Sequence, residues 1–215
     1  ELPLVILNVQ RGGPSTGLPT KSEQTDLLQA LFGRNGESPM PVIAATSPTN
    51  CFDAAYYATK MALEHMTPVV LLTDAFVANG SGAFKLPDLN DYPDICPPYV
   101  TPEMAGSYTP YMRNPDTQVR YWPSPGQEVY AYSRWVGEGR PDRSISTDPE
   151  NHDKMCRLRA EKVARIPVPD VEVQGCVDDA ELLIVGFGGT YGHLHSAMDE
   201  WWLQARKWLW LISLT

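Results

Sequence analysis

The chain has 215 residues, a formal net charge of −9 and 43% hydrophobic residues, which suits one or two domains with a real core. The acidic charge argues against nucleic acid as a partner, and no apolar run is long enough to span a bilayer, so we expect no membrane partner either. The four cysteines are dispersed without C-x-x-C spacing, which indicates neither a metal site nor a disulfide framework, so we expect reduced thiols and a cytoplasmic protein.

The first predicted element is a strand over Leu2–Val9, whose near-continuous apolar run is typical of a parallel strand buried on both faces. It leads directly into Gln10–Thr20, a loop rich in Gly, Pro and small hydroxyl residues. Open α/β sheets bind ligands just outside the carboxyl ends of their strands. Glycines let backbone N–H groups approach a ligand, and Arg11 can contact a carboxylate or phosphate with two parallel hydrogen bonds. We predict an anion-binding loop; a tight turn with a solvated Arg11 explains the pattern equally well.

Helices and strands then alternate at the spacing of a doubly wound sheet. The predicted elements are a helix capped by Ser22 and ending at Gly33, a strand over Val42–Ala45, a helix over Cys51–Met66 and a buried strand over Pro68–Thr73. This β-α-β-α-β order predicts an α/β fold with a parallel doubly wound sheet. Asp74 is predicted to cap the next turn, with ligand binding as the alternative, and His65 is predicted to act structurally, as a cation at a helix end.

Between Lys85 and Gln127 the chain interleaves many prolines with tyrosines and a tryptophan. Such density of proline excludes regular helix or a central strand. The stretch is too aromatic for a free disordered linker. We therefore predict an ordered, extended segment that lies across other surfaces and connects two domains.

A charged helix and a second glycine loop follow. The helix is predicted from Asp148 to about Ile166, with Lys162 among its solvated residues and His152 on its surface. A strand over Glu181–Phe187 leads into Gly188–Gly192 and a further helix through Ala197. The G-x-G-x-x-G spacing is absent, so we predict tight strand-to-helix packing and not a dinucleotide site. His193 and His195 are too close in sequence to share a helix face, which argues against a paired metal site.

Several strings of the chain resemble the alpha subunit of the 2-oxoacid:ferredoxin oxidoreductases, most closely the 2-oxoglutarate type. The longest is Asn8–Gln24, which reads NVQRGGPSTGLPTKSEQ, and the others are Arg34–Glu37, Thr67–Asp74, Asp148–His152 and Leu182–Gly192. The resemblance implies a thiamine-diphosphate-binding sheet of the pyrimidine-domain type over residues 1–84. It further implies an extended interdomain segment over 85–147, then a linker helix and the start of a transketolase C-terminal-like α/β domain over 148–215.

The same resemblance implies oxidative decarboxylation of a 2-oxoacid to an acyl-CoA and carbon dioxide, with electrons passing to ferredoxin. Thiamine diphosphate would be shared with a beta subunit that also holds magnesium and an iron–sulfur cluster. Within this chain the resemblance implies no catalytic residue and no metal ligand. It implies Arg11 as the anchor for the carboxylate of the 2-oxoacid or for coenzyme A, with a pocket wall formed by Gly12, Gly13, Pro14, Ser15, Thr16 and Thr20.

Two other functions stay open at this point. The chain could be a non-catalytic assembly module whose proline- and aromatic-rich segment docks a partner, since acidic charge and an extended segment fit that function as well. It could also belong to another thiamine-dependent enzyme of the transketolase type. Loss of electron transfer on substitution of Arg11 would separate an oxidoreductase from a docking module.

The chain departs from the family's pattern in three places. It begins at Glu1 and enters a strand at once, so we expect a fragment that lacks an upstream Tyr-Pro-Ile-Thr-Pro-like motif and the catalytic glutamate. The stretches 131–144 and 201–215 do not match the family. Codons that can encode these stretches would, in a shifted reading frame, encode residues like those of the family. We therefore hypothesise that both stretches are frameshifted and carry no function; an intact reading frame in resequenced DNA would refute this.

Overall fold

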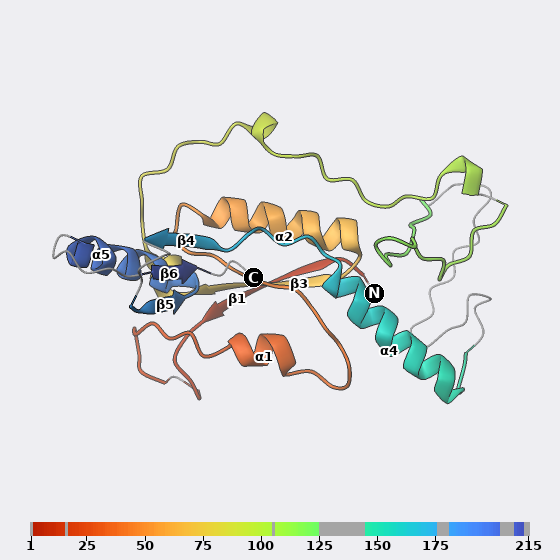
Figure 1. Ribbon diagram of the computed structural model, residues 1–215, viewed down its shortest axis with the longest axis horizontal. Coiled ribbons are helices and arrows are strands. Elements are labelled where there is room, and N and C mark those ends of the chain that lie inside the picture. Colours follow the sequence, from red (N-terminus) through yellow and green to blue (C-terminus); the bar gives the residue numbers. More distant parts are fainter. Residues whose placement is uncertain are drawn as a thin grey trace.

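The first half of the chain folds into a parallel sheet with a helix on each face. The computed structural model describes residues 2–15, 17–104, 106–124, 145–175, 181–202 and 209–212. Its first sheet has the strand order β1 (Leu4–Gln10), β3 (Pro68–Asp74) and β2 (Val42–Ala44), all parallel. Helices α1 (Leu27–Phe32) and α2 (Cys51–His65) lie on opposite sides of this sheet (Figure 1). The predicted doubly wound α/β fold is confirmed.

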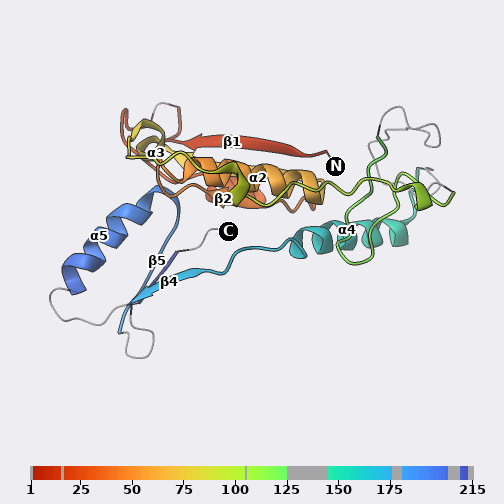
Figure 2. The same ribbon diagram turned by 90° about the horizontal axis from the view of Figure 1, so that it is seen from above.

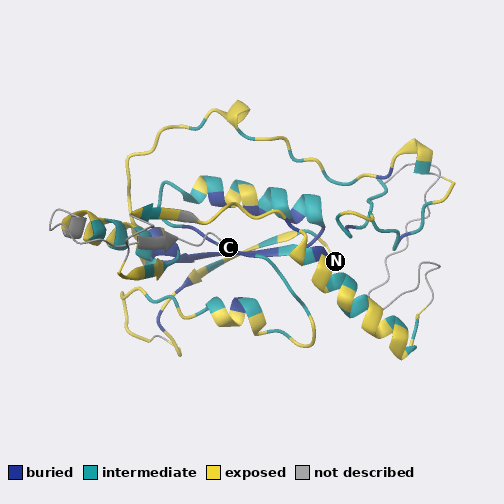
Figure 3. Ribbon diagram, viewed as in Figure 1, coloured by how far each residue is buried: buried dark blue, intermediate teal, exposed yellow. Residues whose placement is uncertain are grey.

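Strand β3 forms the centre of the core, because its side chains alternate between the two faces. Val69 and Leu71 pack in one cluster with the alanines of α2, whereas Val70 and Leu72 pack in a second cluster with Ala30 of α1. Figure 3 shows buried residues concentrated along the middle of the sheet. Full burial of each such Val or Leu stabilises the fold by about 1.5–3 kcal/mol, so β3 binds both helices to the sheet.

Strand β1 differs from its prediction because it lies at the edge of the sheet. Its side chains Leu4, Leu7 and Val9 are 56%, 61% and 46% exposed, so the prediction of burial on both faces is wrong. Within the described residues β1 pairs with β3 alone, and Figure 2 shows it along one margin of the molecule. An apolar run therefore predicted the strand correctly but not its position in the sheet.

Helix α1 begins later than predicted, at Leu27, and Ser22 is not its cap. Asp26, the residue just before the helix, is hydrogen-bonded to β1. The backbone N–H of Asp26 donates to Gln10 Oε1 (3.1 Å), and Asn8 Nδ2 donates to the Asp26 carboxylate (3.0 Å). These tertiary hydrogen bonds override the local capping signal. The remaining predicted helices and strands of the first sheet match the observed ones to within one residue.

After α3 (Ala75–Asn79), the proline- and aromatic-rich segment runs along α2 and contains the 3₁₀ turns η1 (Leu89–Asp91) and η2 (Pro102–Met104) (Figure 1). The Tyr92 hydroxyl donates to Asp53 of α2, and this hydrogen bond raises the pKa of Tyr92 to about 12. Further along, the Cys96 N–H donates to Glu64 (2.8 Å). The segment is thus extended and hydrogen-bonded to α2, whereas its predicted role as a connection between two domains stays a prediction. Residues 105 and 125–127 are outside the described part.

Helix α4 (Pro149–Ala164) begins as predicted, with Asp148 accepting a hydrogen bond from the Glu150 N–H (3.1 Å). Lys162 was expected in solvent but is only 4% exposed, and its Nζ donates to the Met66 carbonyl at 2.9 Å. Mainly because of burial, the pKa of the neighbouring His65 is lowered. The neutral imidazole is therefore favoured there, contrary to the cation expected at this helix end.

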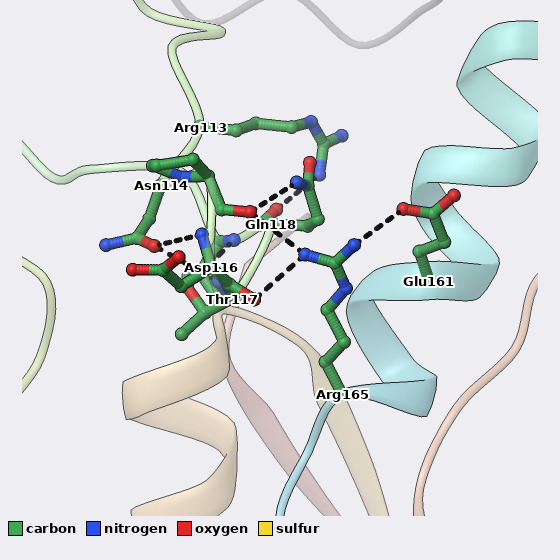
Figure 4. A network of polar contacts seen from close by, with 9 residues as sticks. Arg113, Asn114, Asp116, Thr117, Gln118, Glu161 and Arg165 are labelled. Atoms are coloured by element: carbon green, nitrogen blue, oxygen red, sulfur yellow. Dashed lines mark hydrogen bonds and ion pairs between the residues drawn. The ribbon is translucent and has the colours of Figure 1, made fainter.

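The carboxyl end of α4 holds the extended segment in place through Arg165 (Figure 4). Its guanidinium donates to the carbonyls of Pro115 and Asp116, each at 2.9 Å, and pairs with Glu161 at 3.2 Å. The Arg165 side chain thus binds backbone carbonyls that lie 50 and 49 residues earlier in the chain. This contact fixes the turn at residues 114–118 against the helix.

A second, smaller sheet follows α4. Its strand order is β4 (Glu172–Gly175), β6 (Leu209–Ile212) and β5 (Leu183–Gly186), with β6 antiparallel to β4 and parallel to β5. The 3₁₀ turn η3 (Gly188–Thr190) and helix α5 (Tyr191–Trp202) follow β5, and α5 extends past its predicted end at Ala197. The stretch 131–144 lies outside the described residues, and the frameshift hypothesis stays a prediction.

In the described ranges no helix has the length and apolarity to cross a membrane. In the same ranges Cys51, Cys96 and Cys156 are free cysteines, and Cys176 lies outside them.

Candidate functional site

The carboxyl edge of the first sheet gathers the glycine-rich loops of the chain. Gln10 and Asp74 are register partners at the ends of β1 and β3, so the loop that starts at Arg11 leaves the sheet beside Asp74. The turn η3, more than 100 residues later, packs against the end of β3. This edge is where parallel α/β sheets bind their ligands.

The loop after β1 is compact and relies on unusual backbone geometry. The Gly13–Pro14 peptide is cis, and Ser15 and Thr20 have φ values of 57° and 61°. Gly17 also has a positive φ, and its N–H donates to the Pro14 carbonyl at 3.2 Å. A Cβ at Gly17 would lie 2.8 Å from the Gly13 nitrogen, so only glycine lets the loop fold back this closely.

Arg11 is exposed at the base of this loop, and its guanidinium donates to the Ser15 carbonyl. This bond keeps the cation beside the loop and not extended into solvent. Gly12 is buried, and a Cβ there would lie 3.4 Å from the Glu23 carboxylate. The other predicted pocket residues that the structure describes are exposed on the same loop: Gly13, Pro14, Ser15 and Thr20. Thr16 is outside the described residues.

Asp74 is a buried carboxylate, 3% exposed, that binds groups from three parts of the chain. Its Oδ1 accepts from the Val77 N–H at 2.9 Å, which confirms the predicted capping role at the start of α3. Its Oδ2 accepts from Gln24 Nε2 at 3.2 Å. Gly189 packs directly on the carboxylate, since a Cβ there would lie 2.8 Å from Asp74 Cγ.

Close packing explains the glycines at the end of β5 and in the second glycine loop, Gly188–Gly192. A Cβ on Gly186 would overlap Leu194 Cδ1 of α5, and Gly188 has a φ of 60°. The prediction of tight strand-to-helix packing is confirmed. The His193 ring lies against that of Phe76, with centroids 4.8 Å apart and a tilt of 52°, while His195 Nδ1 lies 3.2 Å from Asp199 Oδ2.

Sequence reasoning missed the role of Gln24 at this edge. Besides its bond to Asp74, Gln24 Nε2 donates to the Phe187 carbonyl at 3.0 Å, so one amide connects the first sheet to the strand–loop of the second. A polar residue just before an amphipathic helix carries no signal of a partner 163 residues away. Its only signal was its place in the long string Asn8–Gln24.

A parallel doubly wound sheet with a glycine-rich loop at its carboxyl edge defines the class of α/β proteins that bind ligands at the carboxyl ends of their strands. Residues 1–156 match the family described as pyruvate flavodoxin/ferredoxin oxidoreductase, thiamine diphosphate-binding. The chain belongs to this family.

Among curated proteins, the chain is similar to 2-oxoglutarate oxidoreductase subunit KorA of Mycobacterium tuberculosis. The two are 47% identical over 200 residues, covering 92% of this chain and 30% of the relative. It is 33% identical to 2-oxoglutarate synthase subunit KorA of Methanothermobacter marburgensis, covering 87% of this chain and 49% of that protein. The chain therefore spans between about a third and a half of the length of these two relatives.

A solved structure, 2-oxoglutarate:ferredoxin oxidoreductase from Magnetococcus marinus with 2-oxoglutarate, coenzyme A and succinyl-CoA bound, has a similar fold. Its TM-score is 0.92 at 28% sequence identity, over 99% of this chain and 37% of that chain. The likeness extends past the first sheet into the second sheet.

Proposed function

We propose that this chain forms part of the alpha subunit of a 2-oxoacid:ferredoxin oxidoreductase that acts on 2-oxoglutarate. The supporting observation is an exposed arginine at the ligand-binding edge of a sheet of this family. The relatives named for 2-oxoglutarate, and the Magnetococcus enzyme with 2-oxoglutarate and coenzyme A bound, favour that substrate. The products would be succinyl-CoA, carbon dioxide and reduced ferredoxin, in the cytoplasm.

Arg11 is proposed to bind a carboxylate of the 2-oxoacid or an anionic group of coenzyme A. A guanidinium can contact a carboxylate with two parallel hydrogen bonds, and its charge compensates the anion as water leaves. Gly12, Gly13, Pro14, Ser15, Thr16 and Thr20 would shape the wall beside it. The positive φ at Ser15 and the close turn at Gly17 support a loop with one preferred shape.

Thiamine diphosphate, when bound, supplies the nucleophile and electron sink for decarboxylation of a 2-oxoacid. The donors at this edge are a guanidinium and backbone groups of a glycine-rich loop, which fit the anionic reactants. We therefore assign the residues of this chain to binding and orientation of substrate. The beta subunit is proposed to hold magnesium and the iron–sulfur cluster.

The proposed division of the chain is residues 1–84 as pyrimidine-type domain, 85–147 as interdomain segment and 148–215 as linker helix with transketolase C-terminal-like domain. The bonds from Arg165 to the turn at residues 114–118 support a structured connection.

The test uses a full-length alpha subunit that contains this chain, co-expressed with a beta subunit. Viologen reduction that depends on 2-oxoglutarate and coenzyme A is measured for Arg11→Ala, with Arg157→Ala as a control at an exposed arginine of α4. Loss of a charged contact to substrate costs about 2–5 kcal/mol, so kcat/KM should fall about 30-fold or more. Equal activity of the two variants would refute the role of Arg11, and absence of activity with every 2-oxoacid would refute the function.

A further inference from the structure

Two strings that carry the family resemblance, Arg34–Glu37 and Asp148–His152, have no part in the site described above. The fold brings them together at the first turns of α4. There the side chains of Glu37, His152 and Cys156 present a carboxylate oxygen, an imidazole nitrogen and a thiol sulfur within 4.8 Å of one another. We propose that these residues form a binding site for a zinc-class divalent metal ion, with one coordination position open to solvent.

The distances agree with the coordination geometry of zinc. Cys156 Sγ lies 3.7 Å from His152 Nε2 and 3.7 Å from Glu37 Oε2. A tetrahedral zinc ion, with bonds of about 2.3 Å to sulfur and about 2.1 Å to nitrogen or oxygen, separates such ligand atoms by about 3.6 Å. The three atoms therefore need only small shifts to surround an ion. Three protein ligands with a fourth position open is the arrangement of zinc sites that also bind water or an exogenous group.

Two separate elements position the ligands. His152 and Cys156 are four residues apart on α4, so they share one face of the helix. Glu37 comes from the loop after α1, where Gly36 has a φ of 62°. Arg34 holds that loop by donating to the carbonyls of Leu31 (3.0 Å) and Ser38 (2.8 Å). The site therefore combines a ligand from the loop after α1, which Arg34 holds by hydrogen bonds, with two ligands from the first turns of α4.

The chemistry of the ligand set favours a borderline-soft ion. Thiolate and imidazole suit zinc, whereas magnesium and calcium prefer oxygen ligands alone. A thiolate, a carboxylate and a neutral imidazole together carry the two negative charges that balance a divalent ion. Arg159 Nη2 donates to Cys156 Sγ at 3.1 Å, in the way that outer-shell donors orient metal ligands.

The test titrates the tag-free, reduced, full 215-residue chain with cobalt(II), which reports tetrahedral thiolate ligation by a sulfur-to-cobalt charge-transfer band. We expect one cobalt per chain, displaced by one zinc. Cys156→Ser should lose the band, and His152→Gln and Glu37→Gln should weaken binding about 10-fold or more. The controls Cys96→Ser and His195→Gln, which alter a cysteine and a histidine outside the site, should bind cobalt as the parent does. A band that persists in Cys156→Ser, or no saturable binding, would overturn the proposal.

A second measurement needs no variant. Zinc should slow alkylation of Cys156, followed by mass spectrometry of the peptides, while the exposed Cys96 in the same sample reacts at an unchanged rate. Equal rates at Cys156 with and without zinc would overturn the proposal even if a substituted chain failed to fold. Neither experiment depends on oxidoreductase activity, so the site stands or falls separately from the proposed function.

Discussion

The contact between Gly189 and Asp74 makes a sharp test of how the second glycine loop docks on the first sheet. In Gly189→Ala the new Cβ would lie 2.8 Å from Asp74 Cγ and from Oδ1, closer than folded proteins tolerate. The carboxylate is 3% exposed and has no room to swing away without losing its bond to the Val77 N–H. Either η3 must separate from β3, or the cap of α3 must break.

The size of the effect follows from those two outcomes. Forcing an extra methyl into a packed interior costs about 1–3 kcal/mol, and losing an N-terminal cap costs about 0.5–2 kcal/mol. Since either outcome suffices, we expect Gly189→Ala to lower the free energy of unfolding by about 1–3 kcal/mol. In a protein of this size that corresponds to a drop in Tm of about 2–12 °C.

Gly192 provides the matched control. It lies three residues further along, in α5, and a Cβ there meets nothing within 4 Å. Gly192→Ala should stabilise the chain by about 0.5–1 kcal/mol, because alanine favours helix over glycine. Urea denaturation of both variants measures the difference. Equal unfolding midpoints for Gly189→Ala and Gly192→Ala would refute the docking contact, whereas partial rescue of Gly189→Ala by Asp74→Ser would support it.

Three further predictions concern α4 and its surroundings. Lys162→Met should destabilise the fold by about 1–3 kcal/mol in urea denaturation, because the buried Met66 carbonyl loses its donor. Arg165→Met should increase proteolysis near residue 115 because two carbonyls lose their donor, whereas Arg157→Met, which breaks an exposed pair, should leave the digestion pattern unchanged. Because folding lowers the pKa of His65, stability should fall as the pH drops below about 6.5, and in His65→Gln the urea midpoint should fall less over that range.

Much of the architecture could be predicted because its signals are local. Apolar runs predicted the strands, and the long spacing between Leu4–Gln10 and Pro68–Asp74 suited a doubly wound parallel sheet. Asp74 was predicted to cap the next turn and Asp148 to begin a helix, and each accepts a hydrogen bond from a backbone N–H in the first turn of the helix that follows it. The string Asn8–Gln24 was long and uncommon enough to indicate the family.

Positions that depend on distant partners were not predictable in this way. An apolar run does not distinguish a central strand from an edge strand such as β1, whose Leu7 is 61% exposed. Lys162 has the helical spacing of a solvated residue, yet it is buried on the Met66 carbonyl. Ser22 is a good local cap, but contacts between Asp26 and β1 delay the start of α1.

The sequence alone therefore determined the order of strands and helices, the glycine loops and the family, because periodicity, caps and rare strings act over a few neighbouring residues. The tertiary structure decided which surfaces those elements share. It placed Gln24, Asp74 and Gly189 together at the carboxyl edge, and Glu37 beside His152 and Cys156 on α4. Such groups assemble only when elements more than 100 residues apart dock, and docking depends on the packing of whole faces.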